Sequence, residues 1–207
     1  IGPCRIGRDE APLFLPDIDV YFKRDMALAF RIVDQLADAG CQFIKLAALH
    51  DPESCLAGYN TRYWVAGRGF VEEEYRKVLE RHVLPLPLLG QIADYIRQKG
   101  LAIAMSIYDQ AGLDFAIQKK CELLKIPSSN IVHAPLIRGA VKTGLPVIID
   151  TGRSTHEEVA RAVAWAREDG VKNTLIIQHS PKGPPAPTDA ANLKAMLGMG
   201  KTFGTYF

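Results

Sequence analysis

The chain passes from apolar to polar residues within the stretch Pro146-Val147-Ile148-Ile149-Asp150-Thr151-Gly152. Its three consecutive β-branched residues favour a short strand that is buried on both faces. Polar residues directly after such a strand lie at its carboxyl end, where parallel α/β proteins build their sites. The same succession recurs along the chain, so this stretch predicts one unit of a parallel α/β sheet.

Amphipathic segments separate the apolar runs. Apolar residues recur at helical spacing over residues 26–37 and again over about 89–97, which predicts two helices with one buried face. Ser154 stands three residues before Glu157, a spacing that predicts a capping box at the start of another helix. A further helix is expected from about 188 to 196.

Seven strand candidates alternate with these helices. Eight would close a (β/α)8 TIM barrel, a fold of about 250 residues, and this chain has 207. We therefore expect one incomplete TIM-barrel domain over residues 1–207, seen as about seven βα units with the C-terminal end missing. An open doubly wound sheet is the alternative, but no glycine-rich phosphate loop follows the first strand. The candidate strands lie at 1–4, 42–46, 101–105, 123–126, 146–149 and 174–177 and from about 203.

Composition excludes several classes of protein. With 25 Lys and Arg against 23 Asp and Glu, the net charge of +2 offers no broad electrostatic reason to bind nucleic acid or an anionic membrane. No apolar run approaches the roughly 20 residues that cross a bilayer. The four cysteines are widely spaced without a CxxC pair, which predicts reduced thiols. We expect a cytoplasmic protein whose natural start precedes Ile1.

Polar side chains recur at the predicted carboxyl ends of the strands, where a barrel would direct them into one pocket. Lys45 and Lys125 lie inside otherwise apolar strands and would suit a ligand that carries phosphate and carboxylate, although a lysine at a strand end also extends readily to solvent. His179 suits a metal ligand, an acid–base group or a structural residue. The irregular segment Asp51–Gly69 should lie on the same face. The convergent set comprises Lys45, Ser106, Asp109, Lys125, Ser128, Ser129, Asp150, Thr151 and His179.

Three stretches carry a family resemblance, namely residues 125–130, 142–152 and 179–193. In order and spacing they closely resemble the sialic acid synthase (N-acetylneuraminate synthase) family. Members of that family are TIM-barrel transferases that condense phosphoenolpyruvate with an N-acylated amino sugar, forming a nonulosonic acid and releasing phosphate. The resemblance is strong over about 121–193 and faint over 51–87. It implies carbohydrate biosynthesis, a divalent metal, usually manganese, and a homodimer.

The resemblance also implies roles for individual residues. It assigns catalysis to Lys45 and Lys125. Asn130 would contact the sugar, and His179 would be a metal ligand, with the second metal histidine expected beyond Phe207. Phosphoenolpyruvate would be held by Lys45, Ser106, Lys125, Ser128 and Thr151.

The chain departs from the family pattern at several positions. Ala47 replaces a glutamine, Asn130 replaces an acid, and Asp150 replaces a serine that would touch the phosphate. A carboxylate beside a phosphate is repulsive unless it is protonated or paired. The expected first strand also lacks an acid and consists of Gly2-Pro3-Cys4 instead.

These departures leave two alternatives open. The triplet Gly2-Pro3-Cys4 resembles the opening of the 3-deoxy-octulosonate and heptulosonate phosphate synthases, where the cysteine binds metal. Cys4 would then face one ion together with His179, or else it is a buried structural thiol. The other alternative is a non-catalytic sugar-binding barrel, which Asp150 and Asn130 favour. The sequence identifies neither the sugar nor the metal.

Overall fold

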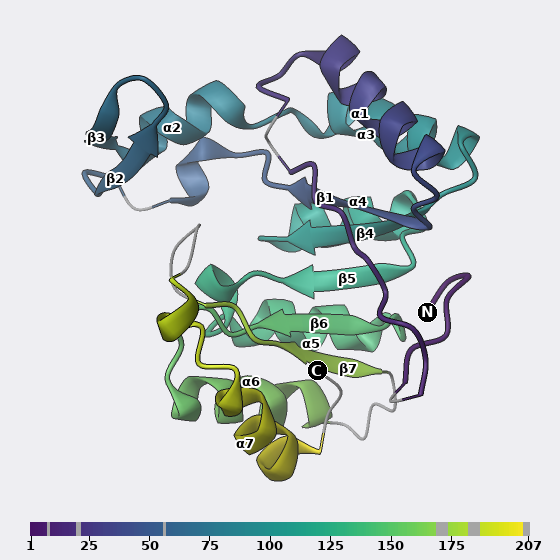
Figure 1. The fold of residues 1–207 in the computed structure, drawn as a ribbon, viewed down its shortest axis with the longest axis vertical. Helices are drawn as coiled ribbons and strands as arrows, with labels where there is room; N and C mark the ends of the chain where they lie inside the picture. Colours follow the sequence, from purple (N-terminus) through teal and green to yellow (C-terminus); the bar gives the residue numbers. More distant parts are fainter. Residues whose placement is uncertain (8, 20–21, 56, 169–173, 182–186, 205–207) are drawn as a thin grey trace.

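The computed structural model describes residues 1–207 with the exception of 8, 20–21, 56, 169–173, 182–186 and 205–207. Its centre is a five-stranded parallel sheet in which neighbouring strands follow one another along the chain (Figure 1). This order is that of consecutive strands in a (β/α)8 barrel. The strands, in sheet order, are β1 (Phe43–Ala48), β4 (Ala102–Ile107), β5 (Leu123–Ile126), β6 (Val147–Asp150) and β7 (Leu175–Gln178).

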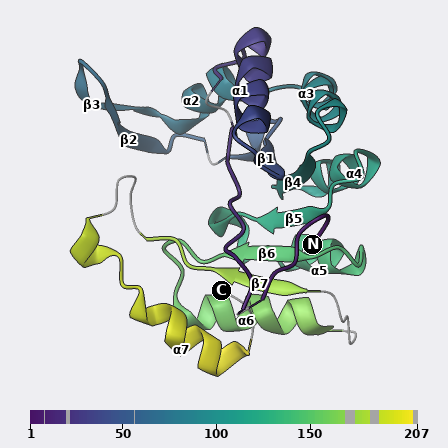
Figure 2. The ribbon, with the colours of Figure 1, turned by 45° about the vertical axis from the view of Figure 1, so that its right-hand side comes forward.

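Helices cover one face of this sheet, as the two ribbon views show (Figures 1 and 2). The predicted capping box exists but lies one residue later than expected, between Thr155 and Glu158. The helix begins one residue later than expected, so Thr155 is its N-cap, and the Ser154 hydroxyl donates to the Gly152 carbonyl at 3.4 Å. The helices are α1 (Met26–Asp38), α2 (Tyr75–His82), α3 (Leu86–Gln98), α4 (Gln110–Gln118), α5 (Ala134–Lys142), α6 (His156–Arg167) and α7 (Lys194–Phe203), with short 3-10 turns η1 (Pro52–Ser54), η2 (Ser128–Asn130) and η4 (Thr188–Ala190).

The alternation of side chains along each strand divides the core into two layers. One set of strand residues, including Ile44, Met105 and Ile149, packs against the helices in the larger cluster. The other set forms a smaller inner layer, of Phe43, Ala102, Ala104, Leu123 and Ile148. N-terminal residues, among them Ile1, Leu13 and Leu15, pack against this inner layer.

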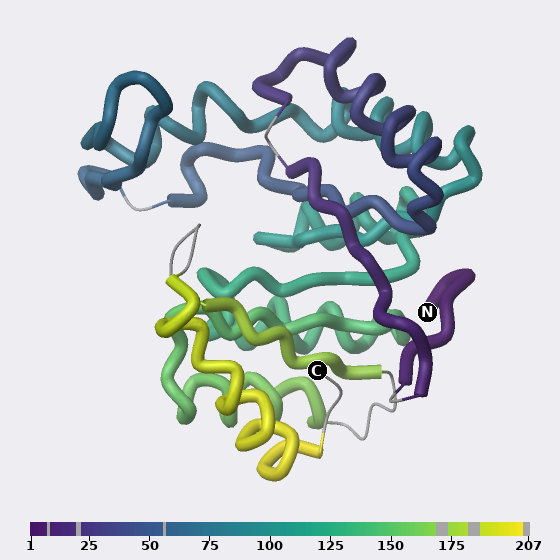
Figure 3. The backbone as a smooth tube through the Cα atoms, in the orientation of Figure 1, coloured from purple at the N-terminus to yellow at the C-terminus, as the bar shows by residue number. Residues whose placement is uncertain are grey.

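The first predicted strand is wrong. Residues 1–4 form a turn, closed by the Cys4 N–H donating to the Ile1 carbonyl at 3.0 Å. Gly2 adopts a φ of +53°, a left-handed conformation that does not fit a strand. The chain instead crosses the inner face (Figure 3) and pairs with β1 through a parallel bridge between Asp17 and Lys45. Thus the segment around Asp17 takes the place that residues 1–4 were expected to fill.

Two other expectations need correction. The segment after β1 is not irregular throughout, because residues with alternating exposure form an antiparallel hairpin, β2 (Asn60–Val65) and β3 (Gly69–Glu74). The chain around Phe203 does not start a strand. It ends α7, which stops at Gly204 with a φ of +56°, and residues 205–207 lie outside the described part. The helix expected over 188–196 is divided into η4 and α7.

All four cysteines are free, as expected. Within the described ranges, no helix is both long enough and apolar enough to cross a membrane.

Candidate active site

Four polar side chains continue the inner face of the sheet toward its carboxyl end. The register places Ser106 opposite Lys125 on the neighbouring strand, and Asp150 lies two residues beyond inward-facing Ile148 on β6. Lys45 likewise lies two residues beyond Phe43 on β1. Lys45, Ser106 and Asp150 expose 6%, 2% and 9% of their surface. Charged and polar side chains are rarely buried to this extent unless they form hydrogen bonds or ion pairs.

The ammonium group of Lys45 has two partners. Its Nζ lies 2.7 Å from Asp17 Oδ2 and donates to Ser106 Oγ at 3.1 Å. The structure therefore brings together Lys45 and Ser106, two of the predicted anion-binding residues. It also adds Asp17, which the sequence analysis missed.

The ammonium group of Lys125 is paired with a carboxylate. Its Nζ lies 2.9 Å from Asp150 Oδ2, and both side chains are almost buried. Asp150 Oδ1 accepts a hydrogen bond from the Gly152 N–H at 3.0 Å. Ser128 lies against the same turn, because a Cβ atom added to Gly152 would come within 3.1 Å of Ser128 Oγ. Lys125, Asp150 and Ser128 thus form a second group beside the first.

Asp19 is the other residue that the sequence analysis missed. Burial raises the pKa of its carboxyl above the ordinary value of 3.8, the positive charge of Lys45 opposes the rise, and the negative charge of Asp17 adds to it. Its Oδ1 is buried and has no hydrogen-bond partner among the described residues. The available signal was the alternation Asp17-Ile18-Asp19 around a buried isoleucine, which is strand-like. The expectation that the first strand lacks an acid is therefore wrong.

Two predicted ligand-binding residues use their polar atoms within the protein. Thr151 Oγ1 donates to the Gln178 carbonyl at 3.0 Å, which ties β6 to β7. Asn130 donates from Nδ2 to the Tyr108 carbonyl at 2.8 Å and accepts from the Ser129 hydroxyl at 2.8 Å. Both residues hold loops of the site in place in this structure.

Asp109, from the same convergent set, serves a helix. Its Oδ1 accepts from the Gly112 N–H at 2.7 Å and so caps α4. Its Oδ2 lies 3.1 Å from His50 Nε2. This pair links the chain just after β1 to the chain just after β4.

The two suggested metal ligands lie at opposite ends of the sheet. His179 follows the carboxyl end of β7, and its Nε2 lies 2.8 Å from the Ala191 carbonyl oxygen. Cys4 lies at the amino end, where its Sγ donates to Gln42 Oε1 at 2.7 Å, just before β1. The idea that Cys4 and His179 face one ion is therefore wrong.

The described side chains do not supply a set of ligands for a metal ion. Across the part of the chain that the structure describes, no three or more His, Cys, Asp and Glu side chains are grouped so that they could hold an ion. A bound divalent cation needs several protein ligands, and the imidazole of His179 would supply one. These residues do not by themselves form a metal centre.

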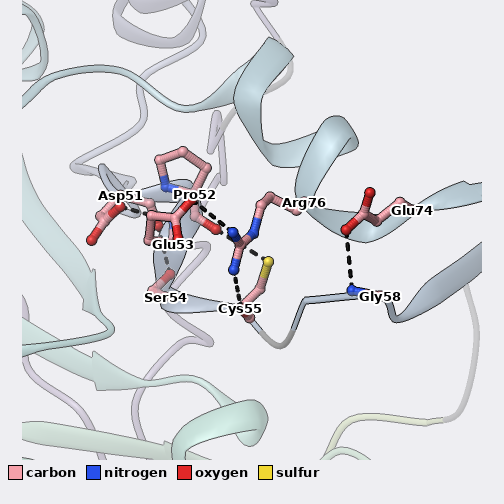
Figure 4. Close-up of polar contacts among 8 residues, drawn as sticks. All are labelled: Asp51, Pro52, Glu53, Ser54, Cys55, Gly58, Glu74 and Arg76. Carbon is pink, nitrogen blue, oxygen red and sulfur yellow. Dashed lines mark hydrogen bonds and ion pairs between the residues drawn. The ribbon is translucent and has the colours of Figure 1, made fainter.

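The chain continues beyond β1 into η1 and the hairpin. Arg76 from α2 lies 2.8 Å from Glu53 and donates to the Cys55 carbonyl at 3.3 Å (Figure 4). Glu74 accepts from the Gly58 N–H at 3.1 Å and so holds the chain just before β2 (Figure 4). These contacts anchor the hairpin, which projects from the barrel (Figure 2).

Fold and site together define a TIM-barrel-type α/β protein with one buried and one nearly buried lysine on neighbouring parts of the inner face of its sheet. The chain belongs to the NeuB family, which it matches over residues 32–207. A solved structure of N-acetylneuraminic acid synthetase from Leptospira borgpetersenii superposes with a TM-score of 0.82 at 21% identity, over 99% of this chain and 66% of that one. The predicted α/β barrel fold and the family resemblance are both confirmed.

Curated relatives agree with this assignment. The chain is 24% identical to a pseudaminic acid synthase of Helicobacter pylori over 96% of its own length. It is 21% identical to an N,N'-diacetyllegionaminic acid synthase of Campylobacter jejuni over 92% of its length. The chain spans 58% of the length of each of these two relatives.

Proposed function

We propose that the protein is a nonulosonic acid synthase, which condenses phosphoenolpyruvate with an N-acylated amino sugar and releases phosphate. The observation that carries the proposal is the convergence of Lys45 and Lys125, with Ser106, at the carboxyl end of the inner face of a NeuB-family barrel sheet. Two ammonium groups and a hydroxyl suit the phosphate and carboxylate groups of phosphoenolpyruvate. The names of the relatives support the same class of product.

In the proposed reaction, C3 of phosphoenolpyruvate attacks the aldehyde carbon of the open-chain sugar. Water adds at C2, and cleavage of the C–O bond releases phosphate. The contribution of Lys45 and Lys125 is to stabilise negative charge on the departing phosphate. Ser106 and Ser128 would orient the ligand by directed hydrogen bonds, so that both substrates are held in one pocket.

A divalent metal, manganese by resemblance, belongs to the proposal as a requirement of the whole protein. His179 would supply one ligand, and the others would have to come from outside the described residues. No step above depends on a metal. A cytoplasmic homodimer is also proposed from the resemblance alone.

One observation favours a second candidate function, a barrel that binds a sugar without turnover. The pairing of Lys125 with Asp150 at 2.9 Å means that phosphoenolpyruvate must compete with a carboxylate for this lysine. The other rival, a different 3-deoxy sugar acid synthase, loses one argument, because Cys4 lies at the far end of the barrel from the pocket.

The test is phosphate release from phosphoenolpyruvate with a panel of N-acylated amino-sugar aldehydes, with manganese and with chelator. We expect sugar-dependent release, and a decrease in kcat/KM of about 10²-fold to 10³-fold in Lys125→Ala, because removal of one charge-stabilising group costs about this much. Lys201→Ala, which changes an exposed lysine at the end of α7, should match the wild type. Full activity in a folded Lys125→Ala variant would refute the role of Lys125. Sugar binding without release would favour the second candidate.

A further inference from the structure

Among the described residues, the candidate site contains three carboxylates and two ammonium groups. Lys45 is paired with Asp17, and Lys125 is paired with Asp150. Asp19 is the remaining acid, and neither lysine forms an ion pair with it among the described residues. Its buried Oδ1 has no hydrogen-bond partner there.

The backbone holds Asp19 in this position at a conformational cost. Its φ is +24°, in the left-handed region that non-glycine residues rarely adopt. The Asp19 N–H donates to Asp17 Oδ1 at 3.1 Å, which helps to hold the turn. A strained backbone and an unpartnered buried oxygen both oppose stability, and such features gather at functional sites.

We propose that Asp19 takes up one proton when a dianionic ligand binds between Lys45 and Lys125. The inference rests on the proposed function, since it assumes that this pocket receives a phosphate-bearing substrate. An incoming dianion adds negative charge beside a carboxylate that has no cation of its own. Protonation of Asp19 removes that repulsion, and a neutral carboxyl group costs less to bury than a carboxylate.

The surroundings of Asp19 agree with this role. Burial already raises the pKa of Asp19 in the free protein. Burial likewise raises the pKa of both nearby tyrosines, so they stay neutral at the pH of the experiment. The titratable groups that face Asp19 are Asp17 on its own segment, Lys45 on β1, Lys125 on β5, Tyr75 on α2 and Tyr108 after β4.

The sign of the effect follows from linkage. A bound dianion raises the pKa of Asp19 further, so the complex holds more protons than the free protein at a pH between the two values. Affinity should therefore rise as the pH falls through the pKa of the complex, by up to about tenfold per pH unit for one proton. The affinity should stop rising once the pH is below the pKa of Asp19 in the free protein.

The experiment is calorimetric titration of the full chain with sulfate and with phosphoenolpyruvate, in two buffers of different ionisation enthalpy, across about pH 5 to 8. Sulfate keeps its charge over this range, so any proton taken up belongs to the protein. We expect uptake that approaches one proton in the wild type and in Asp150→Asn, and none in Asp19→Asn. Asparagine tolerates a positive φ, so Asp19→Asn should fold normally.

Each outcome decides the inference. Uptake that persists in Asp19→Asn, or is lost only in Asp150→Asn, would overturn it. Proton-coupled sulfate binding without turnover would sustain the inference and remove the proposed function. Turnover by a wild-type protein that takes up no proton would sustain the proposed function and overturn the inference about Asp19. Failure to bind either anion at any pH would overturn both the inference and the proposed function.

Discussion

At the scale of single residues, the carboxylate of Asp150 competes with any anion for Lys125, because its Oδ2 lies 2.9 Å from Nζ. Asp150→Asn removes the charge and keeps an oxygen that can accept from Gly152. We expect sulfate to bind about tenfold tighter, or about 1.4 kcal/mol. The free protein should lose about 1–3 kcal/mol of stability, because Lys125 loses its partner. Urea unfolding without sulfate measures the stability of the free protein, and the increase in stability with sulfate measures the affinity for sulfate. Exposed Asp189→Asn should change neither, and weaker sulfate binding by Asp150→Asn would contradict the competition.

At the scale of elements, the hydrogen bonds of Glu73 connect the hairpin to α2. It accepts from Tyr63 of β2 and Arg81 of α2, and these hydrogen bonds, that of Arg81 first, lower its pKa from 4.5 to about 2. A depressed pKa means stability that is present above pH 4.5 and lost as the pH falls toward about 2. We expect Trp64 fluorescence, recorded in a Trp165→Phe background, to change in that window. This change in fluorescence should be absent in Glu73→Gln and present in Glu72→Gln. Identical plots of fluorescence against pH for the two variants would refute the role of Glu73 in connecting the hairpin to α2.

At the scale of the whole molecule, the N-terminal segment and the sheet share the inner layer of the core. Phe43 is fully buried there, and its ring lies against Gly2. Phe43→Ala should lower the free energy of unfolding by about 3–5 kcal/mol and speed amide hydrogen exchange over residues 1–15. Phe14→Ala, at a side chain that is 69% exposed, should stay within about 0.5 kcal/mol. Urea denaturation measures the free energy of unfolding, and amide hydrogen exchange measures the opening of the N-terminal segment. Equal losses of stability in the two variants would mean that the N-terminal segment and the sheet do not share this layer.

The central strands and helices were predictable because their signals are local. The strand expected at 101–105 is found at Ala102–Ile107, and the one expected at 123–126 is found at Leu123–Ile126. The ends of the chain were not predictable in this way. Residues 1–4 include Gly2 and Pro3, two residue types that are depleted in strands. The segment that pairs with β1 lies more than ten residues later. The hairpin escaped prediction because Trp64 and Phe70 lie on its exposed face, so apolar residues occupy both faces and no alternation of apolar with polar residues marks the strands.

Local patterns were sufficient to establish the βα succession and to place Lys45, Ser106 and Lys125 at strand ends. They were sufficient because side chains alternate along a strand and the carboxyl ends of parallel strands share one edge. Long-range packing decided the rest of the pocket. It brought Asp17 beside Lys45, left Asp19 without a cation and carried Cys4 to the opposite end. These outcomes depend on which distant segment pairs with β1, and no local pattern records that choice.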